Sequence, residues 1–196
     1  SIFDTGEYYD QSPVAVYLRA WMASRRSQAE RERDAESARQ SKIRDLEAQV
    51  KFSGIPGFFP TPQAVIQQML ERARIEEWHK VLEPSAGKGD IADEIVKLIP
   101  GEQLDLIERN HTLTSILGVK GYNPRTADFL LFGPDEKYDR ILMNPPFENG
   151  QDIDHVRHAY SLLKPGGRIV AVMSSGPFSR QDRKATEFRE WLDHRW

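Results

Sequence analysis

The sequence predicts an α/β protein: a mostly parallel sheet with helices on both faces, preceded by an N-terminal helical arm. Short apolar runs alternate with helix-like segments through residues 62–173. Within 81–99, a glycine-containing turn joins an apolar run to a helix-like run. Polar motifs follow several apolar runs at the points where strands should end. Because ligands bind beyond the carboxyl ends of parallel strands, these motifs also predict where a functional site lies.

The expected elements follow the alternation along the chain. Strands are expected at residues 80–83, 103–108, 126–128, 138–143 and 168–173. Helices are expected at residues 62–76, 89–98, 111–117 and 152–163, with the last ending at a Lys-Pro-Gly-Gly turn. Beyond them, residues 174–185 predict a mobile loop and residues 186–196 a further helix. Strands and helices in this order are typical of right-handed crossovers that build a parallel sheet.

The N-terminal region predicts a long helix. Residues 1–12 are polar and rich in turn-forming residues, and Pro13 suits the first turn of a helix that runs to about residue 51. Residues 24–44 are almost entirely charged or small and lack a sustained apolar heptad, so a stable coiled coil is not expected. A solvated arm and an arm that packs on a partner or on DNA both remain open. We therefore divide the chain into an arm (1–52) and a second domain (53–196), which begins with a predicted linker at residues 53–57.

Composition excludes several classes of protein. The chain has 196 residues, a formal net charge of −3 and no cysteine, so neither a disulfide framework nor a thiolate zinc site is expected. No apolar run approaches membrane-spanning length, and the first residues lack the pattern of a secretory signal. These features predict a cytoplasmic protein without a membrane partner. A nucleic-acid partner would need a local basic face, because the chain is not globally basic.

The most informative motif is Asn144-Pro145-Pro146-Phe147, which follows the apolar run 138–143. Prolines end the sheet ladder and fix the local backbone. The Asn144 side chain and the Pro145 carbonyl then offer two fixed oxygen acceptors, which suit a substrate NH₂ group. The Phe147 ring suits a planar partner, so the motif predicts a site for a flipped nucleobase amine.

Three further motifs predict a nucleoside cofactor. The turn Glu83-Pro84-Ser85-Ala86-Gly87-Lys88-Gly89 follows a strand and opens a helix, so its glycines let the backbone approach a ligand closely. The next strand ends in Glu108, at the position where a carboxylate holds ribose hydroxyls in doubly wound folds. Asp128-Phe129 pairs an acceptor with a ring that could cover an adenine. Each motif alone is also compatible with an ordinary turn or strand end.

Together these motifs resemble those of class I S-adenosylmethionine-dependent methyltransferases, which have a Rossmann-like sheet. Among them, the chain resembles the DNA adenine-N6 enzymes over about residues 57–175. The resemblance implies catalytic residues Asn144, Pro145, Pro146 and Phe147, and cofactor-binding residues Glu83, Pro84, Gly87, Gly89, Glu108, Asp128 and Phe129. The upstream segment Phe59-Pro60-Thr61-Pro62 matches a Phe-x-Thr-Pro segment that contacts the methionine end of the cofactor, which adds Phe59 and Thr61. Thr61 also suits a helix N-cap, with Pro62 as the first helical residue.

The substrate stays open between three alternatives. DNA adenine is favoured over an RNA base or a protein glutamine amide, and a non-catalytic protein that keeps the fold is the third hypothesis. Restriction-modification is one setting that the resemblance suggests, and phage and regulatory settings stay open. Target recognition is expected from a protein partner or from a C-terminal region absent from this sequence. Basic residues in 174–185, including Arg180 and Lys184, are interpreted as surface charge rather than phosphate contacts. No metal is expected, because His155 and His158 lack a third ligand.

Overall fold

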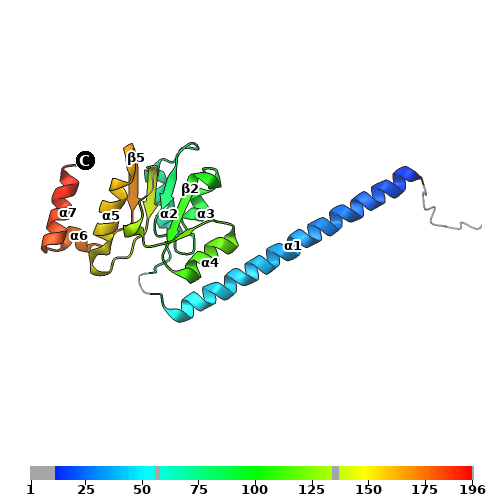
Figure 1. Ribbon diagram of the computed structural model, residues 1–196, viewed down its shortest axis with the longest axis horizontal. Helices are drawn as coiled ribbons and strands as arrows, with labels where there is room; N and C mark the ends of the chain where they lie inside the picture. The colour runs from blue at the N-terminus through cyan, green and yellow to red at the C-terminus, as the bar shows by residue number, and fades with distance from the viewer. Residues whose placement is uncertain (1–11, 56–57, 134–136, 196) are drawn as a thin grey trace, which may run out of the picture. The chain divides into compact units, whose positions relative to one another are not determined.

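Figure 1 shows the computed structural model, which describes residues 12–55, 58–133 and 137–195. The chain separates into two compact units, Ser1–Lys42 and Ile43–Trp196. Helix α1 (Pro13–Ser53) runs through both, in agreement with the predicted long helix. Residues 1–11 of the predicted turn-rich segment lie outside the described residues. None of the helices in the described part of the chain is long and apolar enough to cross a bilayer.

The last turns of α1 belong to the second unit. Ile43 and Val50 are buried there and pack against Leu113 and Ile116 of α4 (His111–Lys120). The boundary between the units therefore falls within α1, upstream of the predicted linker at 53–57. Part of that linker, residues 56–57, lies outside the described chain.

The second unit contains one parallel sheet in the order β3-β2-β1-β4-β5. Its strands are β1 (Val81–Glu83), β2 (Leu104–Glu108), β3 (Arg125–Thr126), β4 (Tyr138–Met143) and β5 (Leu163–Ala171). The chain passes from β1 outward to β3 and then returns to place β4 on the other side of β1. This reversal creates the crevice in which doubly wound sheets bind ligands. The predicted α/β fold with a Rossmann-like parallel sheet is confirmed.

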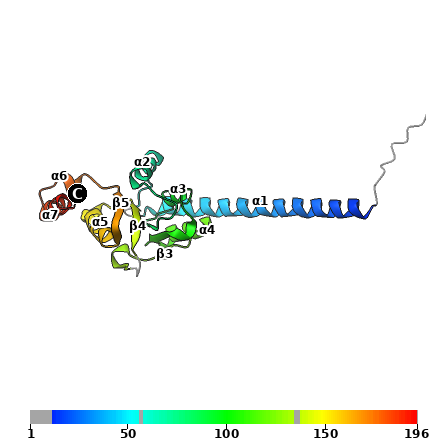
Figure 2. The same ribbon diagram turned by 90° about the horizontal axis from the view of Figure 1, so that it is seen from above.

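Alternating side chains on the central strands build two cores. Val81 packs on one face with α2 (Gln63–Ala73) and α3 (Ala92–Ile95), whereas Leu82 packs on the other with α5 (Gln151–Ser161). This period of two is expected of strands buried on both faces. Figure 2 shows α2 and α5 on opposite sides of the sheet. The C-terminal helix α7 (Arg183–Asp193) adds Phe188, fully buried, to the α5 face.

Several element boundaries differ from the prediction. Helix α3 covers only Ala92–Ile95 of the expected 89–98, because neighbouring backbone bonds such as Leu98 N–H to Ile95 O close three-residue turns. Strand β5 begins at Leu163 and includes the predicted Lys-Pro-Gly-Gly turn as an irregularity, where its register against β4 shifts. The predicted loop 174–185 contains a short helix, α6 (Gly176–Ser179). Asp182 then caps α7 by accepting from the Ala185 N–H.

Candidate functional site

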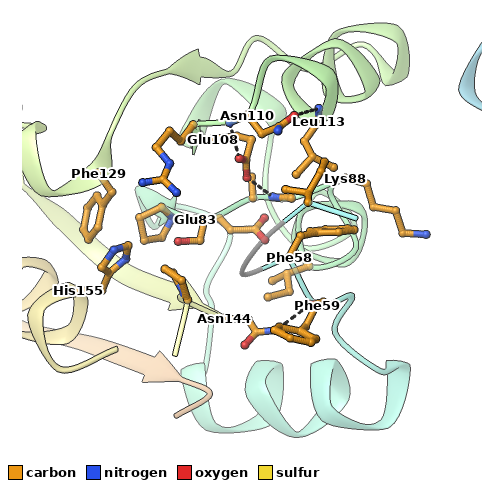
Figure 3. A pocket seen from close by; sticks show the side chains of 18 of the residues that line it. Phe58, Phe59, Glu83, Lys88, Glu108, Asn110, Leu113, Phe129, Asn144 and His155 are labelled. Atoms are coloured by element: carbon orange, nitrogen blue, oxygen red, sulfur yellow. Dashed lines mark hydrogen bonds between the residues drawn. The ribbon is translucent and has the colours of Figure 1, made fainter. Parts of the chain in front are cut away.

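A cavity of about 450 Å³ opens at the carboxyl ends of β1, β2 and β4 (Figure 3). This volume lies within the range of small-molecule sites, roughly 300–1,000 Å³. The predicted site residues that line it are Phe59, Thr61, Glu83, Pro84, Gly87, Glu108, Asp128, Phe129, Asn144 and Pro146. Gly89, Pro145 and Phe147 do not belong to the lining. The fold therefore brings the glycine turn and Asn144 to the same cavity.

Glu108 ties the glycine turn to the loop after β2. Its Oε2 accepts from the Gly87 N–H at 2.8 Å and its Oε1 from the Asn110 N–H at 2.7 Å. Burial raises the pKa of Glu108, while the backbone hydrogen bonds from Asn110 and Gly87 oppose the rise. A carboxylate has about four acceptor positions, so both oxygens keep capacity for ligand hydroxyls.

The two glycines of the turn serve different contacts. Gly87 has φ +57°, and a Cβ added there would come within 2.9 Å of the Phe58 ring, which lines the cavity. Gly89 has φ +93°, and a Cβ there would come within 2.8 Å of Leu117 in α4. Gly87 thus shapes the cavity wall, whereas Gly89 lets the turn pack against a helix. A direct contact of Gly89 with a cofactor stays a prediction.

Glu83 is the most deeply buried acid of the cavity. Its side chain is 1% exposed, and its Oε2 has no hydrogen-bond partner in the described protein. Burial raises the pKa of Glu83 well above its usual range, and the nearby Asp90, Asp93 and Glu108 add to the rise. An unpartnered buried carboxyl is costly for the folded protein, and a cation or donor bound beside it would offset that cost.

The two polar atoms of the Asn144 amide differ, because the nitrogen has hydrogen-bond partners and the buried oxygen has none. Its Nδ2 donates to the Phe59 carbonyl and to the Thr61 hydroxyl, both at 3.1 Å. Its Oδ1 is buried and has no hydrogen-bond partner in the described protein. Because the Phe59 carbonyl is only an acceptor, it must face the amide nitrogen, which leaves the oxygen as the free end. Figure 3 shows Asn144 turned with its amide nitrogen toward Phe59.

The aromatic residues beside Asn144 are Phe59 and Phe147. Their ring centroids lie 6.5 Å apart, with the ring planes within 10° of parallel. Phe59 is 61% exposed, so this pair lies at the surface beside the cavity. Pro145 is buried and Pro146 half-buried, and only Pro146 reaches the cavity wall. The predicted roles of the Pro145 carbonyl and the Phe147 ring stay predictions.

Asp128 and Phe129, the predicted adenine-binding pair, also line the cavity. Asp128 accepts from the Leu130 N–H at 2.9 Å, which starts the short helix η2 (Phe129–Leu131). The Phe129 ring packs against His155 with centroids 5.4 Å apart (Figure 3). His155 is 7% exposed, and burial lowers its pKa, which favours the neutral imidazole. Among the described residues, no group of three or more His, Cys, Asp or Glu side chains is placed to hold a metal.

Several lining residues were not among the predicted site residues. They include Phe58, Lys88, Asp90, Arg109, Gln151 and His155. Lys88 donates to Glu47 of α1 at 3.1 Å and lies 3.5 Å from Asp90. Glu47 falls in the predicted arm (1–52), and nothing in the sequence of that arm distinguishes it from the other acidic residues there. Phe58 could have been predicted, since it directly precedes Phe59, which was predicted to contact the cofactor.

The Thr61 interpretation as a helix cap is wrong. The N-cap of α2 is Pro62, and no side chain forms a capping hydrogen bond there. Thr61 instead directs its hydroxyl to Asn144. A residue before proline is held in an extended conformation, which carries the Thr61 side chain away from the helix end.

Residues 62–181 match the model of the methyltransferase small domain family. The chain belongs to this family. The family agrees with the predicted methyltransferase class, and together with the glycine turn and the acceptors at Glu83 and Glu108 it supports S-adenosylmethionine as the cofactor. The resemblance to DNA adenine-N6 enzymes in particular stays a prediction.

Curated relatives include two ubiquinone/menaquinone biosynthesis C-methyltransferases UbiE. The protein from Pasteurella multocida (strain Pm70) is 30% identical over 53% of this chain and 42% of its own length. The protein from Pseudoalteromonas translucida (strain TAC 125) is 30% identical over 62% of this chain and 53% of its own length. The chain therefore spans about half the length of these relatives.

Similar solved structures include two subunits described as parts of type I restriction enzymes. The modification subunit from Vibrio vulnificus YJ016 has a TM-score of 0.61 at 20% identity, over 80% of this chain and 42% of that one. The methyltransferase subunit from Streptococcus thermophilus has a TM-score of 0.57 at 19% identity, over 68% and 38%. A Thermotoga maritima O-methyltransferase has a TM-score of 0.53 at 15% identity, over 70% and 51%. These likenesses show the fold.

Proposed function

We propose that this chain transfers a methyl group from S-adenosylmethionine to the exocyclic N6 amine of adenine in DNA. The adenine would be flipped out of the duplex to reach Asn144. The observation that carries the proposal is the half-open Asn144 amide at the cavity that contains the glycine turn. Its free atom is an oxygen, which only accepts hydrogen bonds, so it matches a substrate that presents an N–H.

The cofactor end of the cavity has acceptors for the ribose hydroxyls and for the amine of a nucleoside. When bound, S-adenosylmethionine supplies a methyl group already activated by its sulfonium. The open positions on the Glu108 oxygens accept from ribose hydroxyls, and Asp128 accepts from the adenine amine of the cofactor. Glu83 places a carboxyl beside the glycine turn, where a positively charged group stabilises its ionised form.

At the acceptor end, Asn144 makes the substrate amine more nucleophilic. The lone pair of an adenine amine is delocalised into the ring. Hydrogen bonds from that amine to the Asn144 Oδ1 and the Pro145 carbonyl favour a pyramidal nitrogen and localise the lone pair. As the N–C bond forms, the S–C bond to the methyl group would break and S-adenosylhomocysteine would leave as a neutral thioether. The positive charge would pass to nitrogen beside oxygen dipoles that the fold has already oriented, and the amine would then lose one proton to solvent. Phe147 stacks on the base, which contributes on the order of 1–3 kcal/mol.

Two observations favour a DNA amine over other acceptors. The UbiE relatives are named C-methyltransferases, but a carbon acceptor has no N–H to offer the open Asn144 oxygen. Two structural neighbours are described as subunits of type I restriction enzymes, which is consistent with a DNA substrate and with protein partners for target recognition. An RNA base amine or a glutamine amide presents the same N–H and remains the alternative.

The experiment is to incubate the chain with isotope-labelled S-adenosylmethionine and unmethylated DNA, RNA or protein in separate reactions. Mass spectrometry of the digested products identifies the methylated group. We expect N6-methyladenine from DNA, and far less of it from the Asn144→Ala variant in the same reaction time. Label found only in RNA or only in protein would show that DNA is not the substrate. Label on a carbon atom would contradict the proposal that the acceptor is an amine. Bound cofactor without transfer to any acceptor would indicate a binding protein.

A further inference from the structure

Two groups that precede α2 contact the Asn144 amide. Thr61 and Phe59 are distant from Asn144 in the sequence, yet the Thr61 hydroxyl and the Phe59 carbonyl each accept from its Nδ2 at 3.1 Å. The resemblance to known methyltransferases implies that Phe59 and Thr61 contact the cofactor. The contact observed here is with the residue at the acceptor end of the cavity.

We propose that Thr61 is a positioning residue for methyl transfer, which acts with the Phe59 carbonyl to fix the Asn144 amide with its oxygen toward the acceptor amine. This inference rests on the proposed function, because it assigns a role within the same transfer step. It moves Thr61 from holding the cofactor to orienting the group that receives the substrate.

The two contacts do different work. An amide can turn over and exchange the positions of its oxygen and nitrogen with almost no change in shape. Turning Asn144 over would place Oδ1 against the Phe59 carbonyl oxygen with no hydrogen between them, so Phe59 selects the orientation. The Thr61 hydroxyl can donate or accept and therefore does not select it. Its bond instead holds the amide plane at a second point, which restricts rotation about the last side-chain torsion.

The local backbone explains why Thr61 is free for this role. Pro62 is the N-cap of α2, with an extended backbone (φ −60°, ψ 142°), and no side chain caps the helix. The Thr61 hydroxyl is partly buried against Asn144 rather than bonded to the helix end. A threonine used only to start the helix would direct its oxygen to backbone N–H groups of the first turn.

The test compares three variants of Thr61 with the wild-type chain. Thr61→Val removes the hydroxyl at nearly constant shape, Thr61→Ala removes it with less bulk, and Thr61→Ser keeps it. Side-chain amide resonances of Asn144, assigned by their loss in Asn144→Ala, report hydrogen exchange without any substrate. Calorimetry with S-adenosylhomocysteine reports cofactor binding, and single-turnover methylation of DNA at saturating cofactor reports the transfer step.

We expect Thr61→Val and Thr61→Ala to speed exchange of the Asn144 amide and to slow single-turnover transfer by about 10–100-fold, the scale on which small displacements of reacting groups act. The affinity of these variants for S-adenosylhomocysteine should not change. Thr61→Ser, which keeps the hydroxyl, should show amide exchange and a single-turnover rate close to those of the wild-type chain. Weaker S-adenosylhomocysteine binding with a normal saturated rate would overturn the inference and return Thr61 to the cofactor. Unchanged amide exchange in both hydroxyl-free variants would also overturn it. A wild-type chain that does not methylate DNA refutes the proposed function alone, because the exchange comparison still tests the amide contact.

Discussion

The two ends of the cavity differ in how their polar groups are satisfied. At the cofactor end, both oxygens of Glu108 already accept backbone N–H groups, from Gly87 and Asn110. At the acceptor end, Asn144 donates through Nδ2 to two protein groups, but its Oδ1 has no partner in the described protein. The Glu108 carboxylate is therefore held by the backbone before a ligand binds, although the Glu83 Oε2 at the same end has no partner in the described protein. The Asn144 amide is held through its nitrogen only, and its oxygen remains without a partner.

This difference separates binding from chemistry. Neighbouring loops at the ends of β1 and β2 build the Glu108 contacts, so they should hold a nucleoside whether or not an acceptor is present. The Asn144 oxygen is unsatisfied at a cost, and buried groups without partners are rare in folded proteins. We infer that the open oxygen is retained because the substrate amine completes it. The predictions below change one end and measure whether the other is affected.

The largest expected effect follows from Asn144→Ala. Removing the open oxygen should lower single-turnover methylation of DNA by about 10²–10³-fold, the usual cost of losing one oriented group in a transfer step. Binding of S-adenosylhomocysteine, measured by calorimetry, should stay at the wild-type value. A variant that loses cofactor binding in parallel with turnover would show that the two ends are not separable.

Glu108→Ala should affect binding instead. It removes the acceptor for two backbone N–H groups and for the ribose, so affinity for S-adenosylhomocysteine should fall by roughly 10–100-fold, given about 1.5–3 kcal/mol for hydrogen bonds to a charged group. The matched control is Glu102→Ala, which removes an exposed acid outside the cavity lining. Equal affinities for the two variants would remove Glu108 from the cofactor site.

Phe147→Leu tests the aromatic contact at the acceptor end. Loss of stacking on a flipped base should raise the KM for DNA by about tenfold, within the roughly 1–3 kcal/mol that such contacts contribute. Cofactor affinity should not change. Phe52→Leu provides the control, because Phe52 is 93% exposed and lies outside the cavity. A normal KM for Phe147→Leu would leave Phe147 as a surface partner of Phe59.

The smallest effect concerns stability and pH at Glu83. Burial raises the pKa of Glu83 in the folded protein above 4.5, so the folded state binds this proton more tightly than the unfolded state. The contribution of Glu83 to stability is therefore fully present below pH 4.5 and is lost as the pH rises through the pKa of Glu83 in the folded protein. Glu83→Gln, which stays neutral, should raise the melting temperature at pH 8 and converge with wild type near pH 4.5. Parallel pH profiles for both proteins would contradict a raised pKa.

The parts of the candidate site that could be predicted from the sequence are those that depend on local sequence alone. The order of strands and helices, and the motifs at Glu83, Glu108 and Asp128, follow from short apolar runs and the residues that end them. Their side chains reach the cavity because parallel strands all end at the same edge of the sheet. Asn144 reaches it for the same reason.

Contacts between distant segments could not be predicted in this way. The pairing of Thr61 with Asn144 depends on how α2 packs against the sheet, and neither residue carries a local sign of the other. Glu47 contacts Lys88 only because the end of α1 packs against α4. Gly89 was assigned to the ligand from a turn pattern, although the close neighbour of that glycine is Leu117.

A structure of the chain with S-adenosylhomocysteine and a DNA oligonucleotide that presents an unpaired adenine would test the central claim most directly. We expect the adenine N6 within about 2.7–3.2 Å of the Asn144 Oδ1, as a hydrogen bond requires. The Asn144 Nδ2 should keep its contacts with Phe59 and Thr61. An Asn144 oxygen bonded to the cofactor, or an adenine bound away from Asn144, would contradict the account.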